Sequence, residues 1–99
     1  MVAATEIDAL KQLLATGTRI LYEHGLFDAF GHLSARLPGT DRFLINPRQS
    51  PALLRPETVL TMTLDGEVVE WEGQPNSEWH IHASIYRARP DVRSVVHAH

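Results

Sequence analysis

The last residues of the sequence, His97-Ala98-His99, have types and spacing that suit a metal ion. Side chains alternate between the faces of a β-strand, so His97 and His99 would point the same way, with Cβ atoms roughly 6.5–7 Å apart. Two imidazoles at that spacing can converge on one divalent cation, because Zn–N bonds are about 2.0–2.1 Å long. The alternative is a pair of polar residues on a solvent-facing strand, and the spacing alone leaves both interpretations open.

A second group of chemically capable residues lies on a predicted helix. Glu78 and His82 are four residues apart and share a helix face, with Tyr86 one turn further on. One interpretation is a solvated Glu–His pair. The other is a carboxylate directed into a site shared with His97 and His99, because the chain turns at Pro90 and returns along the last strand. Catalytic zinc sites use three protein ligands, so the third would come from Glu78, from another chain or from sequence beyond His99.

The elements that must position these residues can be predicted from the apolar pattern. Residues 5–24 form an amphipathic helix with Thr5 as the N-cap and Gly25 just past the C-terminal end. Residues 31–38 and 42–47 are predicted strands, and 48–58 a loop with at most one helical turn. Residues 59–73 predict a hairpin with its turn at Asp65-Gly66.

The last third of the chain predicts a helix and a strand. Asn76 or Ser77 would cap a helix that runs to about residue 89 and ends before Pro90. Its buried face would carry Ile81, Ile85 and Ala88, and residues 94–99 would form a buried strand. Together the elements predict one α+β domain over residues 1–99, with a mainly antiparallel sheet flanked by helices.

Composition excludes several kinds of chemistry. There is no cysteine, which rules out disulfides, thiolate metal ligands and cysteine nucleophiles. Lys11 is the only lysine and lies in a predicted surface helix, which argues against a Schiff base. The net charge is −3 with no basic cluster, so neither nucleic acid nor an anionic membrane is an expected partner. There is no apolar run of membrane-spanning length, and we expect a cytoplasmic protein.

Three segments together resemble the class II aldolase/adducin family. They are SEWHIH (77–82), IYRARPDV (85–92) and VVHAH (95–99), supported upstream by GHLS (31–34) and FLINP (43–47). The resemblance implies an α/β/α sandwich around an antiparallel sheet, of which this chain would be the N-terminal portion, ending before the family's third zinc histidine. It also implies a homotetramer with sites at subunit interfaces.

The resemblance assigns roles to particular residues. His97 and His99 match two zinc ligands, and Glu78 matches a glutamate that binds zinc at rest or acts as the acid/base. The positions that match the substrate-binding residues of the family's sugar-phosphate enzymes, or lie in the matching loops, are His32, Ser34, Asn46, Arg48, Asn76 and Ser77.

Three departures bear on the substrate. The sugar-phosphate enzymes carry asparagine where this chain has His32, a small Thr/Ser-Gly loop where it has residues 46–48, and serine where it has Asn76. Because arginine can bind a carboxylate as well as a phosphate in a bidentate manner, Arg48 leaves room for a carboxylated or aromatic acid.

The leading functional hypothesis is a zinc-dependent lyase that cleaves a small anionic hydroxy-carbonyl compound through a metal-stabilised enediolate. The alternatives are a metal-dependent decarboxylase of a hydroxy or aromatic acid, an epimerase, and a non-enzymatic assembly module such as the adducin heads. We expect the 99-residue chain alone to be poorly stable and inactive.

Overall fold

Strand β2 (Arg42–Ile45) shows why the sequence makes a sheet with two covered faces. Phe43, Leu44 and Ile45 are all fully buried. Because successive side chains point to opposite faces, three buried apolar residues in a row require a layer on each side of the strand. The computed structural model describes residues 3–28, 31–70 and 73–98.

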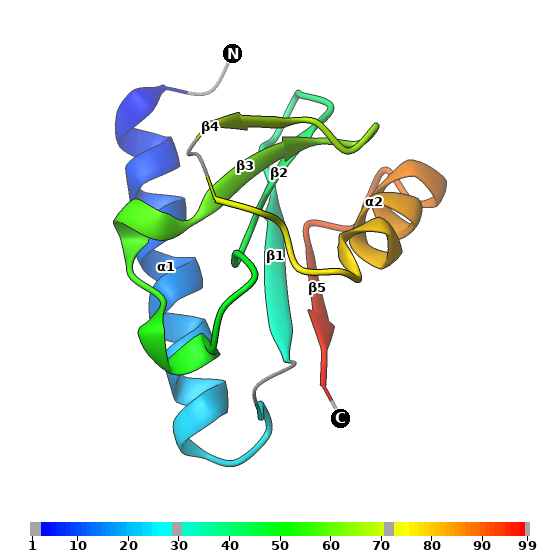
Figure 1. Ribbon diagram of the computed structural model, residues 1–99. Coiled ribbons are helices and arrows are strands. Elements are labelled where there is room, and N and C mark those ends of the chain that lie inside the picture. Colours follow the sequence, from blue (N-terminus) through cyan, green and yellow to red (C-terminus); the bar gives the residue numbers. More distant parts are fainter. Residues whose placement is uncertain (1–2, 29–30, 71–72, 99) are drawn as a thin grey trace.

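The strands form one antiparallel sheet in the order β4-β3-β2-β1-β5. Their bounds are β1 His32–Arg36, β2 Arg42–Ile45, β3 Leu60–Thr63, β4 Val68–Glu70 and β5 Ser94–His97. Helix α1 (Ala4–Glu23) covers one face and α2 (Trp79–Ala88) the other (Figure 1). The predicted α+β sandwich with an antiparallel sheet is therefore confirmed.

Each helix packs on its own half of the core. Leu14 of α1 lies in a cluster with Leu44 of β2, whereas Tyr86 of α2 packs with Phe43 and Ile45 of the same strand.

The single lysine, Lys11, pairs with Glu70 of β4. Neither helix in the described part of the chain combines the length and apolarity needed to cross a membrane.

Both ends of α1 lie close to their predicted positions, but the N-cap is different. The N-cap is Ala3, which has no side-chain oxygen to accept a hydrogen bond, and Thr5 lies within the first turn. The prediction of Thr5 as the cap was therefore wrong by two residues. At the other end, Gly25 has φ +77°, the left-handed conformation that glycine adopts just past a helix.

The buried face of α2 is not the predicted one. His82, Ala83 and Tyr86 are buried, whereas Ile81 and Ile85 are only half-buried and Ala88 is exposed. The prediction counted only apolar side chains. A histidine and a tyrosine can take the inner face here because their polar atoms find hydrogen-bond partners on β1.

The prediction that Asn76 or Ser77 caps α2 was wrong, because the N-cap lies one residue beyond Ser77. The helix begins at Trp79, with Glu78 at the N-cap position. The Asn76 side chain accepts a hydrogen bond from the Glu78 backbone N–H, at 3.1 Å. Asn76 therefore stabilises the turn that leads into the helix.

Strand β5 is an edge strand and not the buried strand that was predicted. It pairs only with β1 in the described sheet, and Val96 is 53% exposed. The Val-Val pair suggested burial on both faces, but one of those faces is open. The pairing nevertheless brings the end of β5 beside the start of β1, which matters for the site.

The hairpin turn follows the prediction, whereas the preceding loop contains one helical turn more than predicted. The β3–β4 turn contains Asp65 and Gly66, and Gly66 has φ +98°. The 48–58 segment contains two single-turn 3₁₀ helices, Pro51–Leu53 and Pro56–Thr58. An isolated bridge between Pro47 and Pro75 links this loop to the segment before α2.

Candidate metal and substrate site

Four side chains from three elements meet at one end of the sheet. His32 is the first residue of β1, His97 the last of β5, and Glu78 and His82 come from the start of α2. His32 and His97 are direct partners in the antiparallel β1–β5 register. Their side chains therefore leave the sheet on the same face, which is the face that α2 covers.

The Glu78 carboxylate lies between two imidazoles. Its Oε1 atom is 3.3 Å from His32 Nε2 and 3.7 Å from His97 Nε2. Ligand atoms of these three residues all lie within 4.8 Å of one another. The structure thus brings Glu78 and His97 together, as the shared-site interpretation predicted, while His99 lies outside the described residues.

The donor set suits a divalent cation. Imidazole nitrogens and a carboxylate oxygen are among the usual ligands of zinc, and both kinds of atom bind it at about 2.0–2.2 Å. Glu78 and His97 would hold the ion, and both are half-buried, so an ion there would keep access to solvent. The chemistry of the residues present therefore fits the metal that the sequence suggested.

The interpretation of Glu78 and His82 as a solvated pair is wrong. His82 is fully buried, and its ring nitrogens contact β1 at both ends. Its Nε2 atom is 2.6 Å from His32 Nδ1, and its Nδ1 atom is 2.6 Å from the Ser34 hydroxyl. Helix spacing correctly placed Glu78 and His82 one turn apart. It could not show that His82 would be buried between α2 and the sheet.

Ser34 continues this chain of contacts to Tyr86. Its hydroxyl is 2.6 Å from the Tyr86 hydroxyl as well as from His82, and Ser34 is fully buried. Ser34 does not line the pocket next to Glu78. The expectation that Ser34 contacts substrate therefore does not fit the structure, because its hydroxyl is enclosed between two residues of α2.

Burial controls the protonation of this inner group. Desolvation, followed by the charges of His32 and His97, lowers the pKa of His82 from 6.5 to about 3. Desolvation also raises the pKa of Tyr86 to about 12, against the opposing effect of its hydrogen bond with Ser34. At neutral pH the His82 ring is thus uncharged and the Tyr86 phenol keeps its proton.

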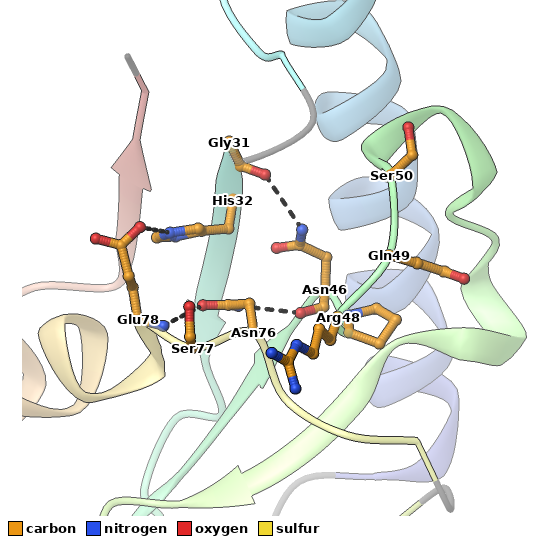
Figure 2. Close-up of a pocket in the computed structure, with 10 residues that line it drawn as sticks. Gly31, His32, Asn46, Arg48, Gln49, Ser50, Asn76, Ser77 and Glu78 are labelled. Atoms are coloured by element: carbon orange, nitrogen blue, oxygen red, sulfur yellow. Dashed lines mark hydrogen bonds and ion pairs between the residues drawn. The ribbon is translucent and has the colours of Figure 1, made fainter.

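A pocket of about 340 Å³ opens beside Glu78. Figure 2 shows side chains from β1, from the loop after β2 and from the segment before α2 around it. Its lining includes five of the predicted substrate-binding residues: His32, Asn46, Arg48, Asn76 and Ser77.

Two of these residues also build the pocket wall. Asn46 is buried, accepts a hydrogen bond from the Leu33 backbone N–H and donates one to the Gly31 carbonyl. Asn76 donates to the Asn46 carbonyl at 3.2 Å. Arg48 and Ser77 are exposed at the pocket, so they are better placed than Asn46 to meet a ligand.

Sequence reasoning missed the position of His32 relative to the metal-binding residues. It lies against Glu78 and stacks on His97, with ring centroids 4.7 Å apart and planes inclined by 8°. Alternation along residues 31–38 predicted that His32 and Ser34 share a face. It did not predict the register between this strand and the last one, which brings His32 against His97.

Comparison with known proteins identifies the wider group. Residues 12–99 match the family described as "Class II Aldolase and Adducin N-terminal domain". A 5-methylthioribulose-1-phosphate/5-deoxyribulose-1-phosphate aldolase of Rhodospirillum rubrum is 38% identical over an alignment of 99 positions, which covers 84% of this chain and 42% of that protein. Decarboxylase tropJ of Talaromyces stipitatus is 35% identical over 88 residues, covering 85% and 33%.

The fold also matches that of a solved aldolase structure. An L-fuculose 1-phosphate aldolase structure superposes with a TM-score of 0.85 at 29% identity, over all of this chain and 46% of that one. The matched part thus spans between about a third and a half of the length of these three proteins.

Proposed function

The chain belongs to the class II aldolase and adducin N-terminal domain family, and from this premise we propose that it carries the metal-binding part of a divalent-metal-dependent lyase. The single observation that supports this most is the Glu78 carboxylate beside His97, within a cluster of nitrogen and oxygen donors. An assembly module would have no need for such a cluster. The proposed substrate is a small hydroxy-carbonyl compound with an anionic group.

Glu78, His97 and His99 would hold the metal, zinc or another divalent ion. When bound, it supplies a Lewis acid that stabilises negative charge developing on a carbonyl oxygen of the substrate. Glu78 takes up or returns the proton that moves when the carbon–carbon bond breaks. Glu78 lines the pocket together with its neighbour Ser77, which supports contact between the carboxylate and a molecule bound there.

Arg48 and Ser77 bind the anionic group of the substrate. Arg48 lies on the loop that follows β2 and lines the pocket, and its backbone N–H donates to the Gln74 carbonyl, at 2.8 Å, in the segment before α2. A guanidinium group offers two parallel N–H donors to a carboxylate or phosphate. Replacing Arg48 with lysine keeps the charge but loses the fork, so we expect KM to rise about tenfold with little change in kcat, which corresponds to about 1.4 kcal/mol.

The second candidate is a decarboxylase of a hydroxy or aromatic acid, and Arg48 is the observation that favours it. Loss of CO₂ leaves the same kind of carbanion as aldol cleavage, so the same cation and the same acid/base would serve. The two candidates differ in where the anionic group goes: an aldolase retains it in a product, whereas a decarboxylase releases it. Parallel assays on sugar phosphates and hydroxy acids separate them.

Metal analysis and two substitutions test the proposal. They are made in the whole lyase, of which this chain is proposed to carry the metal-binding part, and we expect one divalent ion per chain. His97→Ala should lower metal affinity by more than the 10- to 100-fold that loss of an outer partner costs. Glu78→Gln should lower kcat by about 10²- to 10⁴-fold, because the carboxamide cannot carry the proton.

The exposed histidine His80 provides the matched control. His80→Ala removes an imidazole from the same helix and should leave both metal affinity and kcat unchanged. A metal-free protein, or a His97→Ala variant with unchanged activity, would contradict the proposal.

We also propose that the protein acts as a homo-oligomer, a tetramer by the resemblance. Apolar side chains that α1 leaves exposed support this, notably Leu13 at 68% and Ile20 at 51% exposure. Exposed apolar residues on a helix face commonly mark a contact with another chain.

A further inference from the structure

Both ring nitrogens of His32 are engaged within the protein, which restricts what this residue can do. Nδ1 lies 2.6 Å from His82 Nε2, and Nε2 lies 3.3 Å from Glu78 Oε1. His32 is only 2% exposed. The ring is therefore fixed between a buried helix residue and the carboxylate, although its proximity to His97 suggests a metal ligand at first sight.

The orientation of the rings argues against a shared ion. A ligating imidazole directs its lone pair within the ring plane, so the ion lies in that plane about 2.0–2.1 Å from the nitrogen. The His32 and His97 rings are stacked with planes only 8° from parallel. Stacked parallel planes do not meet near the rings, so one ion cannot lie in both as they are arranged.

The direction of the hydrogen bonds leads to the same conclusion. An ionised glutamate only accepts, so the contact with Glu78 requires a proton on His32 Nε2. In the singly protonated His32 ring, Nδ1 is then an acceptor, and it accepts a hydrogen bond from His82 Nε2–H. A metal ligand at His32 Nε2 would need the opposite arrangement, with the lone pair on Nε2 and the proton on Nδ1.

The rest of the chain satisfies this direction without a conflict. His82 Nδ1 becomes an acceptor for the Ser34 hydroxyl, and the Ser34 oxygen accepts from the Tyr86 hydroxyl. Every group then donates once along the chain. The arrangement agrees with an uncharged His82 and a protonated Tyr86, which their shifted pKa values give.

We propose that His32 is a positioning residue that holds the Glu78 carboxylate through Nε2–H, and that it is not a ligand of the cation. This inference rests on the proposed function, since it specifies how the acid/base of that site is oriented. Tyr86, Ser34 and His82 form the buried support that fixes the ring of His32 in this tautomer. The assignment replaces the direct substrate contact that the resemblance implies for His32.

Nitrogen NMR of ¹⁵N-histidine-labelled protein tests the inference directly. His32 signals are assigned by their loss in His32→Phe, and spectra are recorded at neutral pH without metal and with Zn²⁺ alone. We expect the proton of His32 on Nε2 in both spectra, and a zinc-induced shift at His97 but not at His32. An unprotonated His32 Nε2, or a zinc-bound shift there, overturns the assignment.

The same spectra separate this inference from the proposed function. If Zn²⁺ shifts no histidine signal at all, the proposed function fails, whereas the metal-free spectrum still decides the tautomer of His32. If His97 and His32 both shift on zinc addition, the proposed function stands and the present inference fails.

Two substitutions give an independent readout. His32→Phe removes the donor to Glu78 and should weaken Zn²⁺ binding by about 10-fold or more, as the loss of an outer partner does. His32→Gln places an amide N–H near the Nε2 position and should recover most of that loss. If His32 is itself a ligand, glutamine will not restore binding, because a neutral amide is a poor substitute for imidazole on zinc.

Discussion

At the scale of single residues, the unusual feature is a line of polar side chains buried between α2 and the sheet. His82, Ser34 and His32 are each at most 2% exposed. Burying such groups without partners would cost several kcal/mol in total, so the short contacts among them are a condition for the fold. The same contacts limit which protonation states the native protein accepts.

The low pKa of His82 predicts acid lability. With a pKa of 6.5 in the unfolded chain and about 3 in the native one, the unfolded state binds more protons between these values. The free energy of unfolding should therefore fall as pH drops from about 6.5 towards 3, by up to about 1.4 kcal/mol per pH unit. Urea unfolding at a series of pH values measures it.

His82→Gln provides the comparison, because glutamine keeps a polar side chain but does not titrate. Its unfolding free energy should be lower at neutral pH and depend less on pH over the same range. Equal slopes for the two proteins would show that His82 is not the group responsible.

At the scale of elements, the hairpin and α2 depend on each other through one glycine. A Cβ atom at Gly66 would lie 2.5 Å from Cη2 of Trp79, the first residue of α2. Gly66 also has φ +98°, which L-residues rarely adopt. The β3–β4 turn therefore approaches the helix so closely that only glycine fits.

Gly66→Ala should destabilise the protein by more than the roughly 1–3 kcal/mol that backbone strain costs. Gly25→Ala is the matched control, because Gly25 has φ +77° but nothing within 4 Å of the added Cβ. The difference between the two variants in thermal or urea unfolding isolates the clash with Trp79. Equal losses would show that the tryptophan moves aside at no cost.

How much of this could be predicted from the sequence differs between elements. The hairpin turn and the limits of α1 follow from local signals. The predicted helix and hairpin lie within a few residues of the observed α1, β3 and β4. The buried face of α2 could not be predicted, because His82 and Tyr86 become inner residues only through partners that β1 supplies. The edge position of β5 depends on strand order, which the run Val95-Val96 does not encode.

At the scale of the whole molecule, the described chain leaves apolar surface uncovered. Leu13, Ile20 and Leu53 are each more than half exposed, and so is Val96 on the edge strand. An unpaired edge beside exposed apolar side chains is a typical site of association. The proteins to which it is similar are at least twice as long.

The 99-residue chain on its own should be poorly stable and self-associating, and it should lack activity. Light scattering coupled to size exclusion would detect the association, and Leu13→Gln should reduce it, because Leu13 is exposed on α1. Gln12→Ala on the same helix is the control that leaves the apolar side chain in place. A cooperative melt of a monomer that binds zinc tightly would contradict this prediction.

The pairing of His32 with His97 across β1 and β5 has a consequence for how this sequence can change over evolutionary time. A shift of β5 by one position along β1 would keep a strand at the edge but turn His97 to the side of α1. A shift by two positions would return the His97 side chain to the side of α2. Insertions and deletions in the turn between α2 and β5 should therefore survive selection more often when they change its length by an even number of residues than by an odd number.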